Sequence, residues 1–363
     1  MGFDVKLNIL YRFIKYNAKS VPFMHQKPIF ILAIESSCDD TAAAVMQNDK
    51  VLSNIVAQQA IHEQYGGVVP ELASRAHQQN IVPVIDVALK KANVTKDQLS
   101  AIAFTQGPGL MGSLLVGSSF AKSMAMSLDI PIIAVNHMHA HILAHFIDEE
   151  GFDKPEFPFL ALTISGGHTQ IVKVSSFFDM EIIGETTDDA VGEAFDKSAK
   201  ILGLPYPGGP LVDKYAQLGN PKAYKFTKPK MPNLDFSFSG LKTQILYFIQ
   251  NNVKENPNFI DENRNDICAS IQNIIIEILM EKLKLAVQQT GIKQIAIGGG
   301  VSANSGIRNT LKEAEKKYGW KTFIPKFEYT TDNAAMIGIV GYQRFLENKF
   351  NDASVVSKAR IDF

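Results

Sequence analysis

Cysteine is scarce in this chain: only two of its 363 residues, Cys38 and Cys268, carry a thiol. So few cysteines exclude a disulfide framework and favour a reducing compartment. The chain also carries almost no net charge, because 36 Lys and Arg face 37 Asp and Glu. This balance argues against a whole-molecule basic binder of nucleic acid. A hydrophobic content of 46% with 20% charged residues excludes a disordered chain and allows a sizeable core.

Charge is missing altogether from residues 98–121, a run long enough to raise the question of a membrane span. Gly107, Pro108 and Gly109 interrupt this run with a turn. The turn divides it into a short strand and the start of a helix, so we reject a membrane span.

Acidic residues are rare in residues 1–23, where Asp4 is the single acid among four basic side chains. A mitochondrial presequence has a similar composition. The alternative is a plain extension, or an upstream start codon with Met24 as the true beginning. We favour the extension and expect a cytoplasmic protein; a genuine presequence would place it in mitochondria.

Alternating apolar strands and helical segments predict an α/β fold. A strand, a small polar turn and a second strand occur twice, over residues 29–47 and 159–174. This repetition predicts two similarly built lobes whose hairpins face a central cleft. The polar residues 149–158 mark the expected boundary. We therefore predict an extension over 1–28, an N-terminal lobe over 29–152 and a C-terminal lobe over 153–363, with the last helix packing back toward the first lobe.

Four histidines fall within nine residues, and two of them, His137 and His141, are four residues apart after a predicted strand. On a helix this spacing places both imidazoles on one face, which suits a shared metal ion. The alternative is a solvated polar face. A carboxylate would complete the site, and Asp332 is a candidate whose other role is to cap the final helix. The Glu of His-Glu-x-x-His is missing, which argues against a metalloprotease.

Three turns could approach a phosphate. Residues 107–112 match G-x-G-x-x-G, but no acid follows the next strand, so a dinucleotide site is disfavoured. Residues 298–304 end a strand and open a helix, a natural place for an anion. The hairpin over residues 35–41 concentrates acids and hydroxyls, and it suits either a phosphate nest or a network of turn hydrogen bonds.

A basic stretch lies between Asp213 and Asp235 and contains no acid of its own. Tyr224 and Phe226 are interleaved with its lysines. The functional interpretation is a contact surface for a polyanion, and the alternative is a solvated loop. The lysines are Lys214, Lys222, Lys225, Lys228 and Lys230.

Together these motifs resemble one family, the universal tRNA threonylcarbamoyladenosine synthases, called TsaD in bacteria and formerly Gcp or O-sialoglycoprotein endopeptidase. The resemblance runs from about residue 29 to residue 338. It implies the two-lobed fold shared by actin, sugar kinases and heat-shock chaperones (ASKHA), with a central nucleotide and metal cleft. The matching stretches are AIESSCDDTAAAV, YGGVVPELASRAH, TQGPGLMGSLLVG, NHMHAH, TISGGHTQ, GEAFDKSAKILGLPYPGGP, DFSFSGLKT, GGGVSAN and TTDNAAMIG.

The resemblance also implies site residues, which fall on matching positions of this chain. The family's metal ligands fall on His137, His141 and Asp332, and its acidic hairpin residue important for activity falls on Asp39. Asn136 and His139 depart from the residues frequent in relatives. The substrate and nucleotide contacts fall on Thr163, Ile164, Ser165, Gly166, Gly167, Asp196, Gly209, Asp213 and Asn304.

The implied activity transfers a threonylcarbamoyl group from threonylcarbamoyl-AMP to an adenosine of tRNA, with release of AMP. The implied cofactor is one divalent ion, Fe(II) before Zn(II). The implied partners are tRNA and helper proteins similar to TsaB and TsaE, and no membrane. The alternatives are a metal-dependent glycoprotein endopeptidase and an ASKHA-type ATPase or kinase.

Overall fold

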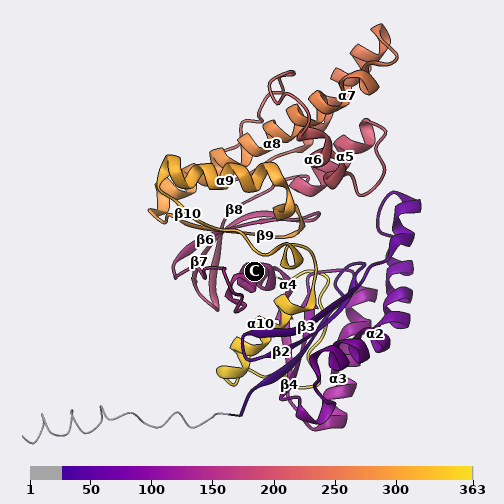
Figure 1. Cartoon of the computed structure of the whole chain (residues 1–363), viewed down its shortest axis with the longest axis vertical. Coiled ribbons are helices and arrows are strands. Elements are labelled where there is room, and N and C mark those ends of the chain that lie inside the picture. Colours follow the sequence, from indigo (N-terminus) through magenta and orange to yellow (C-terminus); the bar gives the residue numbers. More distant parts are fainter. Residues whose placement is uncertain (1–26, 362) are drawn as a thin grey trace, which may run out of the picture.

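Two five-stranded sheets lie one above the other, with helices against them (Figure 1). The computed structural model describes residues 27–361 and residue 363. The predicted α/β class is confirmed. The suggested presequence and most of the predicted extension over 1–28 lie outside the described residues.

The two sheets share one topology. In each, three strands form an antiparallel meander, a fourth strand pairs in parallel with the first strand of the meander, and a fifth pairs in parallel with the fourth. This identity confirms the prediction of two similarly built lobes. The first sheet comprises β1 (Phe30–Glu35), β2 (Thr41–Gln47), β3 (Lys50–Ala57), β4 (Ala101–Gly107) and β5 (Ile132–Asn136). The second comprises β6 (Phe159–Ile164), β7 (Thr169–Ser176), β8 (Asp179–Glu185), β9 (Gln294–Gly298) and β10 (Lys321–Phe323).

The first sheet is buried on both faces, which explains why β1 is apolar from Phe30 to Ile34. Leu32 and Ile34 pack toward α2 (Pro70–Ala92) and α3 (Met111–Leu128). Ile31 and Ala33 point to the opposite face, toward α10 (Ala334–Leu346). Successive side chains of β1 therefore point alternately into two hydrophobic clusters, one on each face of the sheet.

Helix α10 follows the second sheet in sequence but packs on the first. Its glycines allow this approach, because a Cβ on Gly338 would lie 2.5 Å from Met46 Cγ, and one on Gly341 would lie 2.6 Å from Ala103 Cβ. Small residues on both surfaces thus bring the start of α10 close to the ends of the first sheet's strands.

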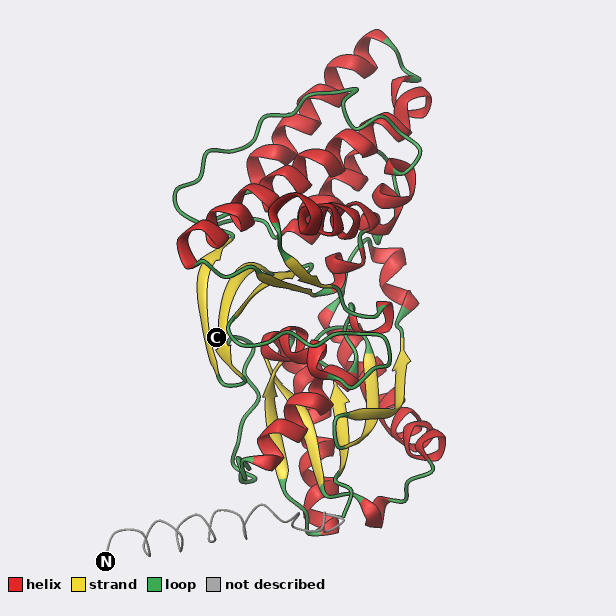
Figure 2. Ribbon diagram, turned by 60° about the vertical axis from the view of Figure 1, so that its left-hand side comes forward, coloured by secondary structure: helices red, strands yellow, loops and turns green. Residues whose placement is uncertain are grey.

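The second sheet carries most of its helices on one face (Figure 2). On the other face, Phe159 and Val172 pack with Ile142 of the short helix α4 (His137–Leu143). Helix α4 also contacts α10, so it lies between the two sheets. The covering helices are α5 (Val191–Ile201), α6 (Gly208–Ala216), α7 (Ser239–Glu255), α8 (Phe259–Thr290) and α9 (Ser305–Tyr318).

The uncharged run of residues 98–121 is divided between β4 and the start of α3, as predicted. No helix in the part of the chain that the structure describes combines the length and the apolar character needed to cross a bilayer.

The G-x-G-x-x-G motif serves close packing between segments. The N–H of Leu110 donates to Ser37 O at 2.7 Å, and the N–H of Gly109 donates to Ala359 O at 3.2 Å. A Cβ on Gly109 would overlap the Ser37 backbone, and one on Gly107 would overlap the carbonyl oxygen of Lys358. The loop is therefore held between the first hairpin and the C-terminal tail, which accounts for its glycines without a dinucleotide.

We predict that Gly109→Ala lowers the free energy of unfolding by about 1–3 kcal/mol, because the added methyl group must displace the Ser37 backbone. Gly166→Ala is the matched control, since nothing lies within 4 Å of a Cβ at that position. Urea unfolding of both variants measures the difference. Equal midpoints for the two would contradict this explanation of the glycine.

Candidate metal centre and cleft

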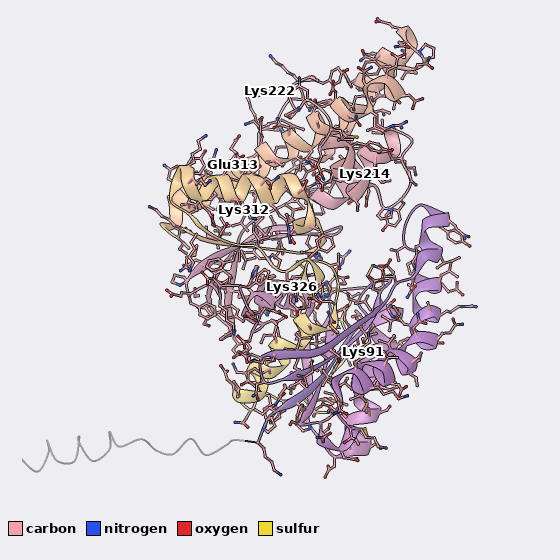
Figure 3. The ribbon with its side chains drawn as sticks, viewed as in Figure 1. Lys91, Lys214, Lys222, Lys312, Glu313 and Lys326 are labelled. Atoms are coloured by element: carbon pink, nitrogen blue, oxygen red, sulfur yellow. The ribbon has the colours of Figure 1, made fainter. Side chains whose placement is uncertain are left out.

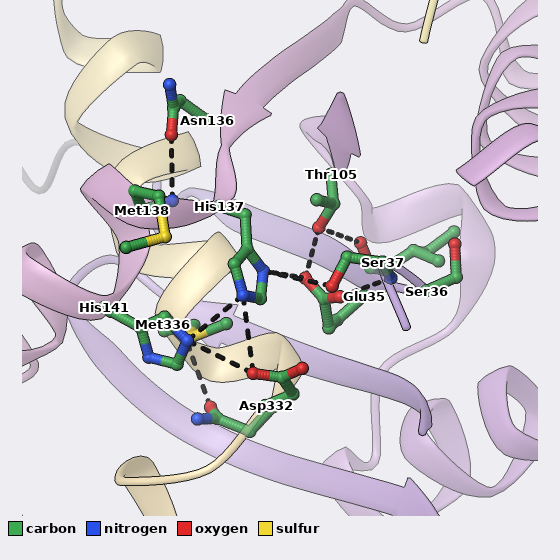
Figure 4. A network of polar contacts seen from close by, with 12 residues as sticks. Glu35, Ser36, Ser37, Thr105, Asn136, His137, Met138, His141, Asp332 and Met336 are labelled. Atoms are coloured by element: carbon green, nitrogen blue, oxygen red, sulfur yellow. Dashed lines mark hydrogen bonds and ion pairs between the residues drawn. The ribbon is translucent and has the colours of Figure 1, made fainter. Parts of the chain in front are cut away.

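The predicted histidine pair meets the predicted carboxylate. Helix α4 begins directly after β5, and the Asn136 side chain caps it by accepting the N–H of Met138 at 2.8 Å. The Nε2 atoms of His137 and His141 lie 3.1 Å apart. Asp332 Oδ1 lies 3.2 Å from His141 Nε2 and 3.4 Å from His137 Nε2 (Figure 4). Three potential ligand atoms therefore converge on one point.

Their separations suit a small divalent ion. With bonds of about 2.1 Å, neighbouring ligand atoms are roughly 3.0 Å apart in an octahedron and roughly 3.4 Å apart in a tetrahedron. The observed 3.1, 3.2 and 3.4 Å fall within this interval. Two imidazole nitrogens and one carboxylate are also a donor set that suits iron or zinc. The residues present fit a metal ion.

The two carboxylates around His137 favour a positive charge at this point. Burial would lower the pKa of His137, but the charges of Asp332 and Glu35 raise it well above its usual value. Burial would raise the pKa of Asp332, but His137 holds it well below its usual range. Both shifts favour a positively charged group between the two acids, and either a proton on His137 or a metal ion would supply it.

Glu35 contacts His137 on the side of the ring that faces away from the site. His137 Nδ1 lies 3.2 Å from Glu35 Oε2, on the side of the ring opposite Asp332. Glu35 is fully buried and also accepts the N–H of Ser37 at 2.6 Å and the hydroxyl of Thr105 (Figure 4). A donated Nδ1–H leaves Nε2 free to act as a ligand. The sequence placed Glu35 in the acidic hairpin but did not indicate this role.

The alternative role predicted for Asp332 is wrong. Asn333 caps α10, because its side chain accepts the N–H of Met336 at 3.1 Å. The carboxylate of Asp332 is therefore free to face the histidines, and 29% of its side chain stays exposed.

The solvated-face alternative for the histidines is wrong as well. His145 is buried, and its Nε2 lies 2.8 Å from Ile297 O. His139 is half-buried beside Phe363, with ring centroids 4.8 Å apart. Burial lowers the pKa of each to about 4, so both are neutral at ordinary pH. His145 thus ties the segment after α4 to the end of β9, while His137 and His141 face the site.

The predicted substrate loop over residues 163–167 begins in the last two residues of β6 and continues into the turn after it. The Ser165 hydroxyl accepts the N–H groups of Gly167 and His168 at 3.3 and 3.0 Å. Thr163 and Ile164 are buried at its base, and nothing lies within 4 Å of a Cβ built on Gly166. The loop therefore presents backbone at its tip and is rigid at its base.

The glycine-rich loop after β9 lies between this substrate loop and α4. A Cβ on Gly299 would lie 2.5 Å from Ile164 O, and one on Gly298 would lie 2.7 Å from His141 O. Gly299 also has a φ of +88°, which favours glycine. Both predicted loops are therefore neighbours of the helix that carries the histidines.

Four predicted nucleotide residues lie around the N-termini of α6 and α9. Asp196 accepts the N–H groups of Gly208 and Gly209 at 2.8 and 3.0 Å. Asp213 accepts the N–H and hydroxyl of Ser305 at 3.1 and 2.7 Å. Asn304 caps α9 through the N–H of Ile307. These side chains join α5, α6 and α9 into one unit, in which each predicted residue has a structural role.

The acidic hairpin borders the cleft from the first lobe. His77 anchors it to α2, with Nδ1 2.8 Å from Thr41 Oγ1 and Nε2 3.0 Å from Cys38 O. Burial raises the pKa of Asp40 to about 7, and the neighbouring charge of Asp39 contributes to the shift. Asp40 therefore exchanges a proton near neutral pH. Because the Ser37 N–H already binds Glu35, this part of the hairpin offers no free phosphate nest.

The basic stretch is exposed on the second lobe, where Lys214 and Lys222 are labelled in Figure 3. Lys228 is neutralised by Glu281 at 2.6 Å. A separate hollow of about 720 Å³ lies between α9 and residues 322–327, and its lining mixes both charge signs, as at Lys312 and Glu313. This hollow does not contain the three converging atoms.

Comparisons with known proteins agree with the fold and the motifs. A family model, TsaD: tRNA N6-adenosine threonylcarbamoyltransferase, matches residues 50–339. A tRNA N6-adenosine threonylcarbamoyltransferase of Christiangramia forsetii is 71% identical over 340 residues, which is 94% of this chain and 100% of that protein. The Riemerella anatipestifer protein of the same name is 60% identical, over 93% of this chain and 98% of the relative.

Solved structures support the fold. HypF of T. kodakarensis aligns with a TM-score of 0.59 and 16% identity, covering 90% of this chain and 50% of that one. A full-length HypF crystallised with phosphate and nucleotide gives 0.58 and 14%, covering 90% and 48%. Identities this low bear on the architecture alone, which is the two-lobed ASKHA arrangement.

Proposed function

The chain belongs to the TsaD family of tRNA N6-adenosine threonylcarbamoyltransferases, and from this premise we propose how its residues carry out the transfer. The enzyme is an acyltransferase that modifies an adenosine of tRNA. The convergence of His137 Nε2, His141 Nε2 and Asp332 Oδ1 is the observation that supports the proposal most strongly.

The proposed donor is threonylcarbamoyl-AMP, and the proposed acceptor is the exocyclic amine of the adenosine adjoining the anticodon in tRNAs that read codons beginning with A. The amine nitrogen bonds to the carbamoyl carbon, the bond from that carbon to the phosphate oxygen breaks, and AMP leaves. An adenine amine is a weak nucleophile. The protein must therefore orient it and stabilise charge on the carbonyl and phosphate oxygens.

The proposed cofactor is one divalent ion, Fe(II) or Zn(II), held by His137, His141 and Asp332. Such an ion supplies a Lewis acid and a template for oxygen atoms of the substrate. Glu35 fixes the ring of His137 by accepting its Nδ1–H, which keeps Nε2 directed at the site.

The two glycine-containing loops supply the proposed substrate contacts. The backbone N–H of Gly166 suits a phosphate or ribose oxygen, because those of Ser165 and Gly167 already donate within the loop. The N–H groups of residues 298–300 suit the same ligand from the adjoining strand. Asp196, Gly209, Asp213 and Asn304 are proposed to line the nucleotide pocket, with Asp196 and Asn304 ordering the helix N-termini against which the nucleotide rests.

Asp39 and Asp40 are proposed to act as a pair on the attacking amine. Asp39 was the residue predicted to be important for activity. Its charge helps to raise the pKa of Asp40 to about 7, after burial as the larger cause. A carboxylate with this pKa accepts a proton efficiently near neutral pH. We therefore assign proton acceptance to Asp40 and the tuning of Asp40 to Asp39.

The proposed partners are tRNA and helper proteins similar to TsaB and TsaE, in the cytoplasm. The exposed lysines Lys214, Lys222 and Lys225 form no ion pair within the described part of the chain, so they are available to RNA phosphates. The acceptor base must be unstacked in a loop of the RNA before it can reach the site.

The function is tested by mass spectrometry of nucleosides after mixing the purified chain with threonylcarbamoyl-AMP, unmodified tRNA and the helper proteins. We expect threonylcarbamoyladenosine to appear together with AMP. Free threonylcarbamoyl-AMP disappearing without modified nucleoside, or ATP turnover in the absence of tRNA, would favour a different activity.

Metal binding is tested on the two histidines that share α4 but differ in direction. His141→Ala should reduce affinity for Zn(II) by more than the roughly 100-fold that follows from loss of an outer partner, because a ligand itself is removed. His139→Ala, on the same helix, should keep the parental affinity. Isothermal titration measures both. Equal Zn(II) affinities for the two variants would contradict the proposal that His141 is a metal ligand.

The proton acceptor is tested by the pH dependence of single-turnover transfer. We expect the rate to fall as the pH drops below about 7, because Asp40 becomes protonated. Asp40→Asn should lower the plateau by about 10²- to 10⁴-fold and abolish this limb. Asp39→Asn should move the limb to lower pH, since it removes a charge that raises the pKa of Asp40. A limb that survives in Asp40→Asn would assign the base elsewhere.

A further inference from the structure

The polypeptide passes twice between the two sheets within the described residues. The first crossing, residues 147–158, follows the segment that carries His137 and His141. The second crossing, residues 324–333, ends at Asp332 and the first turn of α10. The three proposed ligands therefore depend on two crossings that are far apart in sequence.

Glu149 of the first crossing binds two side chains of the second crossing. The hydroxyl of Tyr329 donates to Glu149 Oε1 at 2.5 Å, and Lys326 Nζ lies 3.3 Å from Glu149 Oε2. Tyr329 is only 4% exposed and packs in the cluster of the first lobe that includes α10. A buried phenol that donates to a carboxylate makes a charge-assisted hydrogen bond, which is stronger than a neutral one.

Each end of this contact is anchored to the first lobe. Next to Glu149, the N–H of Asp148 donates to Asp49 O at 2.9 Å, in the turn between β2 and β3. Lys154, further along the same crossing, binds Asp49 at 3.0 Å. The first crossing is thus fixed to the first sheet before it reaches the second.

Only two residues separate Tyr329 from Asp332, and each takes part in hydrogen bonds. The Asn333 side chain donates to Thr331 O at 2.8 Å. The N–H and the hydroxyl of Thr330 both bind Phe327 O, at 3.2 and 2.7 Å. After Asp332, Asn333 caps α10. A shift of the Tyr329 ring would therefore pass directly to the carboxylate of Asp332.

The anchor to the second lobe lies before Tyr329. Arg308 of α9 donates to Pro325 O and to Ser302 O, each at 2.8 Å. Between Pro325 and Tyr329 the second crossing therefore changes from one lobe to the other. Asp332 lies on the first-lobe side of this change, together with the histidines.

We propose that Tyr329, through its hydrogen bond to Glu149, is a positioning residue that fastens the Asp332 segment to the first lobe and so sets the distance between Asp332 and the histidine pair. The inference rests on the metal site proposed above. It places all three ligands on one rigid body, so that their geometry does not depend on the separation of the lobes.

The test measures metal affinity and ligand geometry instead of activity. Tyr329→Phe and Glu149→Ala should each weaken Zn(II) binding by up to about 10-fold, less than the loss of a group bonded directly to a ligand, because they act on Asp332 through the backbone. Glu149→Gln keeps an acceptor for the phenol, so its loss should be smaller than that of Glu149→Ala. Tyr247→Phe is the matched control, since this tyrosine of α7 is 61% exposed.

The visible absorption spectrum of the Co(II)-loaded protein supplies the second measurement, because it reports the arrangement of the ligands. We expect Tyr329→Phe to change this spectrum and Tyr247→Phe to leave it unaltered. Parental affinity and spectrum in both Tyr329→Phe and Glu149→Ala would overturn the proposal, even if their melting temperatures fall. A lower melting temperature alone indicates a purely structural role.

Asp332→Asn separates this inference from the metal site on which it rests. If Asp332→Asn weakens binding while Tyr329→Phe and Glu149→Ala do not, the metal site stands and the positioning role fails. If Asp332→Asn binds Zn(II) as tightly as the parent protein, both fail.

Discussion

Two acids, the buried Glu35 and the partly exposed Asp332, face the ring of His137 from opposite sides, and this arrangement favours a positive charge at the histidine pair. His141 and Asp332 are 191 residues apart in sequence, yet their side chains are 3.2 Å apart. Packing produces this approach, because the glycines of α10 let that helix lie directly on the first sheet beside α4. The packing that buries the core of the first lobe therefore also fixes the distance between Asp332 and the histidines.

The two lobes carry different parts of the proposed site. The first lobe carries the histidines, the carboxylate and the acidic hairpin, whereas the second presents the loops proposed to bind substrate. The contacts of Glu35 also bear on the peptidase alternative. Apart from the proposed ligand Asp332, Glu35 is the acid that contacts the histidine pair, and it already accepts hydrogen bonds from Ser37 and Thr105. A carboxylate with those partners does not serve as a free base for hydrolysis.

Much of the architecture could be predicted from the sequence because the signals are local. Apolar strands and polar turns repeat, and the spacing of His137 and His141 follows from the helical turn. Helices α2 and α6 and strands β3, β8 and β10 were not predicted. The weak alternation of β3, which is only partly buried, gave little signal. Asp332 was one candidate carboxylate, and only the family resemblance placed it in the ligand set. The role of Glu35 was missed, because it depends on contacts distant in sequence. Likewise, G-x-G-x-x-G has the spacing of a nucleotide loop, but the neighbours that explain it come from Ser37 and the tail.

The most direct measurement of the central claim is an anomalous difference map from crystals of the metal-loaded protein, collected at the absorption edge of the added ion. The account predicts one peak about 2.0–2.2 Å from His137 Nε2, His141 Nε2 and Asp332 Oδ1 together. A fully loaded protein whose peak lies away from these three atoms would contradict it.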